Sequence, residues 1–273
     1  MYPRLFQIGP FTIYGYGLML ALAFIIASYV MTRELKRRGM DPNIGSTITL
    51  IALVAGVVGS KILYLIEDWS QFLADPLGAA FSPGGLTFYG GFLLATYAIY
   101  VYLKRKKIRF LKMADIIAPA LMLAYGIGRL GCQLAGDGDY GFPTTLPWGT
   151  DYSQGTYPPS LAFRNFPEIT SKYPGGVVPD NTLCQPTPVY EFIMCAILFV
   201  ILWRAQRHLR PEGKVFTLYL LTAGLERFSI EFMRLNPRIL FGLTEAQLIA
   251  IVLILVGLAG WIYLSRQGSE KPA

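Results

Sequence analysis

Seven apolar runs, each long enough to cross a bilayer as a helix, constrain how this 273-residue chain can fold. In order, the runs are Phe11–Met31, Ile48–Ile66, Leu86–Leu103, Met113–Ile127, Thr187–Trp203, Val215–Met233 and Gln247–Leu264. Hydrophobic residues make up 53% of the chain and charged residues only 15%, which is too apolar for a soluble domain of this size. The sequence therefore predicts an all-α, polytopic membrane protein with seven transmembrane helices, forming a single integral membrane domain over residues 1–273.

Lysine and arginine are distributed unevenly between the connecting loops. Sixteen of the 24 basic residues follow the first, third, fifth and seventh runs, whereas six lie in the opposite set of loops. By the positive-inside rule, the N-terminus is expected outside and the C-terminus in the cytoplasm. The net charge of +7 then reflects topology, and its expected partners are anionic membrane lipids rather than nucleic acid.

The longest loop spans residues 142–185, between the fourth and fifth runs, and is expected outside the membrane. It is rich in Pro, Gly, Tyr and Thr and carries seven aromatic residues. Loops of this length are usually functional or disordered, and aromatic side chains also anchor proteins at the membrane surface. We therefore expect this loop to form a small extracytoplasmic head.

The glycine-rich stretch Gly128–Gly141 follows the fourth run, which is short and is expected to extend into it. This stretch brings Arg129, Asp137 and Asp139 to membrane depth or just beyond. Each ionisable side chain there costs about 2.5–3.5 kcal/mol, so such residues indicate function. Five glycines among them predict irregular backbone, which is tolerated near lipid only where protein or a wet cavity surrounds it. The stretch therefore predicts a charged cavity beside lipid.

Two arginines near the outer ends of apolar runs predict a site for an anion. The guanidinium groups of Arg129 and Arg227 suit phosphate oxygens, and Asp137 and Glu231 lie close to them in sequence. The combination fits a phospholipid headgroup drawn from the outer leaflet. The spacing of Arg227 and Glu231 also fits a structural ion pair on one helix face, so that alternative stays open.

Proton transfer at such a site needs a positioned acid or base. The one histidine lies in a basic loop, which leaves four candidates: Tyr89, Asp137, Glu231 and Lys61. Asp115 follows a basic loop and is expected to act at a helix end or in packing. The three cysteines have no metal-ligand spacing, so neither a metal site nor an organic cofactor is expected.

Six motifs follow one another along the chain: YGLM (Tyr16–Met19), GGLTFYGG (Gly84–Gly91), ADIIAP (Ala114–Pro119), GRLGCQLAGD (Gly128–Asp137), QPTPVYE (Gln185–Glu191) and RFSIEFMR (Arg227–Arg234). With them, the chain resembles the prolipoprotein diacylglyceryl transferases of bacteria over nearly its whole length. The resemblance implies seven helices, an outside N-terminus and a periplasmic head in the bacterial cytoplasmic (inner) membrane. Members of that family move the diacylglyceryl group of phosphatidylglycerol to the thiol of the lipobox cysteine in a preprolipoprotein signal peptide, and glycerol phosphate leaves.

The resemblance also assigns roles to individual residues. It implies that Arg129 and Arg227 bind the phosphate of the donor or leaving group, with catalytic roles for Tyr89, Asp137 and Glu231. It further implies substrate contacts by Tyr16, Lys61, Cys132, Gln185, Tyr190 and Gln247.

Several positions depart from the family pattern, which has glutamate where this chain has Asp137. The pattern has histidine at Tyr89 and Gln185, asparagine at Cys132 and arginine at Lys61. The attacking thiol must become a thiolate, so the missing histidine leaves two hypotheses for the base. Either a Tyr89 phenolate is stabilised by cations, or a carboxylate is the base and Tyr89 only orients the substrate. Cys132 is either a reactive thiol or a small replacement for asparagine.

Three interpretations of the function follow. The first is an active lipid-modifying transferase. The second is a divergent paralogue that binds phospholipid or modifies another acceptor. The third is a seven-helix transporter or receptor, which would spread charges along a path through the membrane. Because the charges instead cluster toward one face and include both arginines and both acids, the sequence favours the first.

Overall fold

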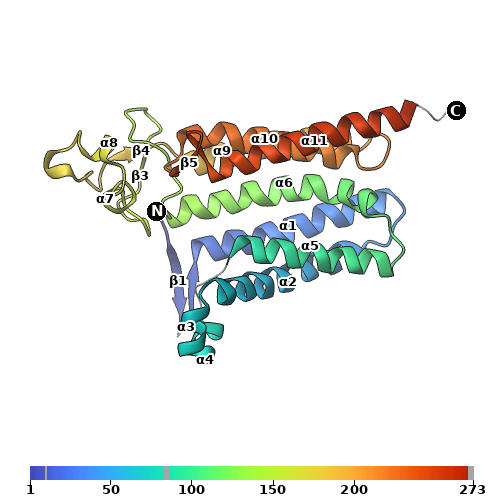
Figure 1. Ribbon diagram of the computed structural model, residues 1–273, viewed down its shortest axis with the longest axis horizontal. Helices are drawn as coiled ribbons and strands as arrows, with labels where there is room; N and C mark the ends of the chain where they lie inside the picture. Colours follow the sequence, from blue (N-terminus) through green and yellow to red (C-terminus); the bar gives the residue numbers. More distant parts are fainter. Residues whose placement is uncertain (10, 83–86, 270–273) are drawn as a thin grey trace. The chain divides into compact units, whose positions relative to one another are not determined.

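The computed structural model describes residues 1–9, 11–82 and 87–269 (Figure 1). Within this part of the chain, each predicted apolar run coincides with one long helix. These helices are α1 (Gly15–Arg37), α2 (Asn43–Glu67), α5 (Phe88–Arg105), α6 (Phe110–Ala135), α9 (Thr187–Ala205), α10 (Lys214–Ile230) and α11 (Glu245–Ser269). The shorter elements are α3 (Trp69–Ala74), α4 (Pro76–Phe81), α7 (Pro159–Ala162), α8 (Pro167–Thr170), η1 (Pro174–Gly176) and η2 (Glu231–Met233).

Five of the long helices are long and apolar enough to cross a membrane, counted over the described residues. They are α1, α2, α6, α9 and α11. The other two, α5 and α10, have 18 and 17 residues. The protein is therefore a mostly helical, multi-pass membrane protein, and the count of seven spans remains a prediction.

The prediction of an all-α chain is wrong in detail, because three two-stranded antiparallel sheets accompany the helices. The sheets pair β1 (Arg4–Ile8) with β2 (Phe11–Tyr14), β3 (Thr150–Asp151) with β4 (Leu183–Cys184), and β5 (Arg238–Leu240) with β6 (Leu243–Thr244). The first hairpin takes the start of the first apolar run, so α1 begins only at Gly15. This segment forms a strand because Thr12, Ile13 and Tyr14 are β-branched or aromatic, residue types that favour strands. Gly9 adopts a positive φ of 58° in the turn before it, which glycine does readily.

The fourth run extends into the glycine-rich stretch, as predicted, because α6 continues through Gly128 and Gly131 to Ala135. The expectation of irregular backbone is therefore wrong for the first half of the stretch. Irregular backbone begins at Gly136 and Gly138, whose φ values are 57° and 89°. Gly131 serves packing, since a Cβ there would lie 3.1 Å from the ring of Tyr16 on α1. The ionisable side chains thus lie on a helix end and on the loop that leaves it.

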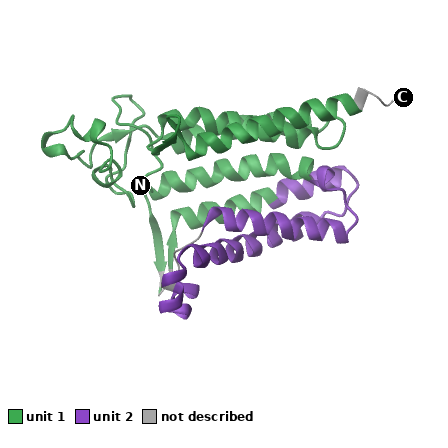
Figure 2. Cartoon of the chain, in the orientation of Figure 1, with its two compact units in different colours: residues 1–27, 114–273 green, residues 28–113 purple. Residues whose placement is uncertain are grey.

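The chain divides into two compact units (Figure 2). The first unit comprises residues 1–27 and 114–273, and the second comprises residues 28–113. In the first unit, α10 lies alongside both α9 and α11 (Figure 1). In the second, α2 packs against α5.

Small residues let the helices of each unit approach closely. In the first unit, a Cβ on Gly257 of α11 would lie 2.6 Å from the backbone nitrogen of Leu221 on α10. In the second, a Cβ on Gly91 of α5 would lie 2.6 Å from the backbone oxygen of Gly56 on α2. The second contact shows that Gly56 and Gly91 allow close packing of α2 against α5.

Asp115 on α6 caps the N-terminus of α10. Gly213 precedes α10 with a positive φ of 98° and has no side chain to cap the helix. The buried carboxylate of Asp115 instead accepts hydrogen bonds from the backbone N–H groups of Gly213 (2.7 Å) and Phe216 (2.8 Å). This arrangement satisfies two N–H groups that the helix leaves unpaired. It confirms the helix-end role expected for Asp115.

Replacing Asp115 by alanine is expected to destabilise the protein by about 2 kcal/mol, because two N–H groups lose their acceptor in a buried place. The measurement is the melting temperature of the purified protein in detergent. Asp41→Ala is the control, since the carboxylate of Asp41 bonds the N–H of Asn43 in an exposed turn. Equal losses for the two variants would contradict the capping role of Asp115.

Candidate functional site

A cluster of ion pairs joins one end of α6, α9 and α10. Glu191 lies in the first part of α9, and its side chain is 0% exposed. Its Oε2 lies 2.8 Å from Nε of Arg129, near the C-terminal end of α6. Its Oε1 lies 3.1 Å from Nη1 of Arg227 and 3.3 Å from Nη1 of Arg234. One fully buried carboxylate therefore pairs with three arginines, one from α6 and two from α10 and the residues that follow it.

Arg129 is fixed by more than its carboxylate partner. Its Nη2 donates a hydrogen bond of 2.9 Å to the hydroxyl oxygen of Tyr125, one turn earlier on α6. The guanidinium carbon also lies 4.9 Å from the centre of the Tyr125 ring, a cation–π contact. The fork is thus oriented before any ligand binds.

Glu231, at the end of α10, pairs with two of the three arginines, Arg227 and Arg234. Its Oε2 lies 2.9 Å from Nη2 of Arg227, one turn earlier, and its Oε1 accepts a 2.5 Å hydrogen bond from Asn236. The ion pair that the spacing of Arg227 and Glu231 allows is therefore present. Because Arg227 also bonds Glu191, this pair belongs to the cluster rather than standing apart from it.

Asp139 bridges two of the arginines. Its Oδ2 pairs with Nη1 of Arg129, and its Oδ1 pairs with Nη2 of Arg234. Burial alone would raise the pKa of the Asp139 carboxyl, but the charges of Arg234 and Arg129 hold it below its usual range. Asp139 is therefore an anion at neutral pH, held between two cations.

Asp137 lies beside this bridge without joining it. Its Oδ1 accepts a 3.3 Å hydrogen bond from the backbone N–H of Asp139. Burial and then the negative charge of Asp139 raise the pKa of the Asp137 carboxyl above its usual range. The sequence singled out Asp137 at this site, whereas the structure brings Asp139 into ion-pair contact with the arginines.

Cys132 lies next to both aspartates. Its Sγ and one carboxylate oxygen each of Asp137 and Asp139 lie within 4.8 Å of one another. A thiol and two carboxylates at this spacing are possible metal ligands, but Nη1 of Arg129 lies 3.7 Å from the same sulfur and pairs with Asp139. Because the positive guanidinium of Arg129 contacts two of the three possible ligands, it would repel a metal cation bound there. The group fits proton transfer or anion binding better than a metal ion.

Tyr16 and Gln247 occupy different parts of the first unit. Tyr16, at the start of α1, packs against Gly131 on the helix that carries Arg129. Gln247 is buried in the first turn of α11, where its Oε1 accepts a bond of 3.1 Å from the N–H of Thr244. The N–H of Gln247 in turn donates to the hydroxyl of Thr244 at 3.2 Å. These two reciprocal bonds between Thr244 and Gln247 form a capping box at the start of α11.

Gln185 and Tyr190 connect the start of α9 to the segment between α6 and α9. The backbone of Gln185 accepts a bond from Gly141 at 2.9 Å, and its side-chain oxygen has no hydrogen-bond partner among the described residues. The hydroxyl of Tyr190 accepts a 2.7 Å bond from Nε1 of Trp148. Along the chain, Tyr190 immediately precedes Glu191 on α9, and Gln185 lies two residues before α9 begins.

Lys61 and Tyr89 belong to the second unit. Nζ of Lys61 donates to the backbone oxygen (3.0 Å) and hydroxyl (2.8 Å) of Ser82, and it lies 5.0 Å from the centre of the Tyr64 ring. Tyr89, in the first turn of α5, is 43% exposed. The first three residues of the GGLTFYGG motif, at positions 84–86, lie outside the described residues.

Comparison with known proteins places this arrangement in a family. The sequence profile of the prolipoprotein diacylglyceryl transferases matches residues 3–263. The chain belongs to this family. Proteins named phosphatidylglycerol–prolipoprotein diacylglyceryl transferase are similar to it: one from Clostridium tetani is 32% identical over 260 residues, covering 94% of this chain and 96% of the relative. Those from Dehalococcoides mccartyi and Streptococcus uberis are each 30% identical, covering 98% and 97% of this chain and 95% and 96% of the relatives.

Three members of the arginine cluster were not among the predicted site residues. They are Glu191, Asp139 and Arg234. Each of them carried a sequence signal. Glu191 is an acidic residue within an apolar run, and Arg234 follows Arg227 by seven residues, which places both on one helical face. Asp139 was named with Arg129 and Asp137 among the ionisable residues of the glycine-rich stretch. Its ion pairs were not predicted, because they depend on the loop that follows α6.

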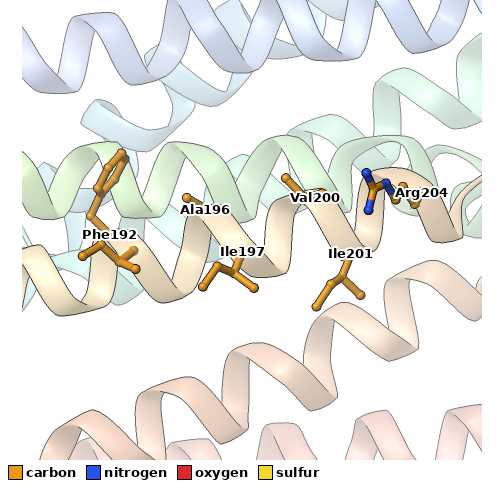
Figure 3. Close-up of a pocket in the computed structure, with 7 residues that line it drawn as sticks. Phe192, Ala196, Ile197, Val200, Ile201 and Arg204 are labelled. Atoms are coloured by element: carbon orange, nitrogen blue, oxygen red, sulfur yellow. The ribbon is translucent and has the colours of Figure 1, made fainter.

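A groove runs along α9 from Phe192, next to Glu191, to Arg204 (Figure 3). Apart from Arg204, its lining is aliphatic or aromatic and includes Ala196, Val200 and Ile201. Side chains of this kind suit hydrocarbon chains rather than polar ligands. In this family member, the charged cluster and an apolar groove are thus carried by the same helix.

Proposed function

We propose that this protein transfers the diacylglyceryl group of phosphatidylglycerol to the lipobox cysteine thiol of a preprolipoprotein, with release of glycerol phosphate. The observation that carries the proposal is the set of three arginines at the end of apolar helices, ordered by Glu191. Guanidinium forks bind phosphate through two parallel hydrogen bonds. The names of the relatives agree with this donor and acceptor.

At the glyceryl carbon, the reaction forms one bond and breaks one. The thiolate sulfur attacks the glyceryl carbon, a C–S bond forms, and the bond from that carbon to the phosphate oxygen breaks. The leaving glycerol phosphate keeps the electron pair, while a base takes the thiol proton. Arg129 and Arg227 stabilise the charge that develops on the departing phosphate. Neither a metal nor an organic cofactor takes part in these steps.

The arrangement in the membrane is part of the proposal. Seven helices span the bacterial cytoplasmic membrane as one integral domain, with the N-terminus outside and the C-terminus in the cytoplasm. Residues 142–185 form the extracytoplasmic head, which is supported by a hydrophobic cluster of its own around Tyr152, Phe163 and Val178. The arginine cluster then faces the outer leaflet, where phosphatidylglycerol and the signal peptide reach it laterally.

The other predicted residues also have proposed roles. Asp137 and Glu231 act with the arginines in catalysis. The remaining residues contact the substrates or orient them: Tyr16, Lys61, Tyr89, Cys132, Gln185, Tyr190 and Gln247. Cys132 acts here as a small residue beside Arg129, which its buried position supports.

Asp137 is the proposed base, because its pKa is raised and its carboxylate lies near the arginines. Asp137→Asn is expected to lower kcat about 100-fold or more, and Tyr89→Phe only to slow turnover. A base works when ionised, so kcat/KM of the wild type should fall as the pH drops through the raised pKa of Asp137. Above that pKa, activity should be full. The measurement is the pH profile of kcat/KM.

The opposite result would assign the base to Tyr89. Under that hypothesis, Tyr89→Phe abolishes turnover. Asp137→Asn still shows the fall of kcat/KM as the pH drops. Phenol ionisation would also place the limb well above neutral pH, because the ordinary pKa of tyrosine is about 10. The two variants together therefore separate the hypotheses.

The transfer reaction itself is tested with purified protein, phosphatidylglycerol vesicles and a lipobox peptide. Release of glycerol phosphate should depend on the peptide cysteine and disappear with a serine peptide. A folded protein that binds phosphatidylglycerol and releases nothing would instead be a divergent paralogue. The confinement of the cluster to one end of α6, α9 and α10 argues against the transporter interpretation.

A further inference from the structure

The arginine cluster is already neutralised by the protein's own carboxylates. Arg129, Arg227 and Arg234 pair with Glu191, Glu231 and Asp139. A phosphate therefore enters a site in which every guanidinium has an anionic partner. A carboxylate that gives up its contacts with two arginines frees donors on both guanidinium groups, which phosphate oxygens can then accept.

The three carboxylates differ in how easily they can leave. The side chains of Glu191 and Glu231 are 0% exposed and are carried by α9 and by η2 at the end of α10. The side chain of Asp139 is 30% exposed and is carried by the loop after α6. A buried charge that loses its partners costs several kcal/mol, whereas a carboxylate with access to water can be rehydrated. Asp139 is therefore the carboxylate that a ligand can displace.

The contacts of Asp139 also match those of a phosphate. Its two oxygens each take one guanidinium, Arg129 from α6 and Arg234 from beyond α10. Two oxygens of a phosphodiester present the same pair of acceptors. The backbone oxygen of Asp139 accepts a 2.7 Å hydrogen bond from the hydroxyl of Thr187, which anchors the loop while the side chain faces the arginines.

We propose that Asp139 is a built-in competitor that occupies the Arg129–Arg234 pair until the phosphate of the lipid donor displaces it. The inference rests on the proposed function and deepens it, because it assigns the control of phosphate affinity to one residue. Only the fraction of protein in which Asp139 has left the arginines can bind the phosphate. The apparent affinity for phosphatidylglycerol is therefore lower than the intrinsic affinity by that fraction. After transfer, Asp139 returns to the arginines and promotes release of glycerol phosphate.

The decisive variant is Asp139→Asn, which keeps the size of the side chain and removes its charge. The KM for dihexanoyl phosphatidylglycerol and the inhibition constant of glycerol phosphate should both fall, each about tenfold. The matched control is Asp151→Asn, an exposed aspartate of the same segment that lies outside the cluster. Its constants should equal those of the wild type.

A second variant keeps every charge. Thr187→Val removes the hydroxyl that anchors the Asp139 backbone, so both constants should fall in the same direction but less. This variant also provides a test should Asp139→Asn fail to fold. Unchanged or higher constants in a folded Asp139→Asn protein would overturn the inference, because a carboxylate that merely positions the arginines supports binding instead of opposing it.

Direct binding separates this inference from the proposed reaction. Calorimetry with glycerol phosphate and dihexanoyl phosphatidylglycerol needs no turnover. If Asp139→Asn binds these ligands more tightly but the wild type shows no transfer, the proposed reaction is wrong and the competition by Asp139 stands. If the wild type is active but binds the ligands as tightly as Asp139→Asn does, the reaction stands and the competition by Asp139 is wrong.

Discussion

Replacing Arg129 by alanine is expected to lower kcat/KM for diacylglyceryl transfer about 1000-fold, the loss typical of removing a preorganised donor from a developing anion. Arg129 pairs with Glu191 and Asp139 and is oriented by Tyr125, so its fork is held in place before the donor binds. The measurement is release of glycerol phosphate from phosphatidylglycerol with a lipobox peptide.

Arg129→Lys tests whether charge alone is enough. A lysine keeps the charge but lacks the planar fork, so it should recover only a small part of the lost activity. Arg164→Ala is the matched control, since Arg164 is an exposed arginine between α7 and α8. Near-normal turnover in Arg129→Ala would show that the phosphate is bound elsewhere.

Replacing Glu191 by glutamine should produce the largest loss of stability. Three arginines share this fully buried carboxylate, and the neutral amide leaves their charges partly uncompensated. Removing one partner of a buried ion pair costs about 3–5 kcal/mol. Thermal unfolding in detergent should therefore shift to clearly lower temperature, and transfer activity should fall because the arginines lose their common anchor.

The control for Glu191 is Glu168→Gln, which removes a charge from an exposed position on α8. Its melting temperature should match that of the wild type. Anionic ligands offer a second check, since glycerol phosphate should stabilise Glu191→Gln more than the wild type by supplying the missing charge. A melting temperature unaffected by Glu191→Gln would mean that the arginines do not depend on this carboxylate.

The sequence alone determined the long helices and pointed to part of the charged cluster. Hydrophobic runs of spanning length predicted the long helices correctly, because burial in lipid leaves the backbone little choice but helix. It also singled out Arg129 and Arg227, which the structure places in the charged cluster, because arginine within or beside an apolar run is costly. For Asp115 the sequence predicted a role at a helix end or in packing, and the structure shows that it caps α10.

The tertiary structure decided which charges meet. Glu191, Asp139 and Arg234 come together from the start of α9, the loop after α6 and the end of α10. The sequence pointed to Asp137 as the site residue because Asp137 ends the GRLGCQLAGD motif, whereas Asp139 lies two residues beyond it. Only the backbone turns at Gly136 and Gly138 determine which carboxylate reaches the guanidinium groups. Helices follow from local hydrophobicity, whereas ion pairing depends on side-chain directions that a loop sets in three dimensions.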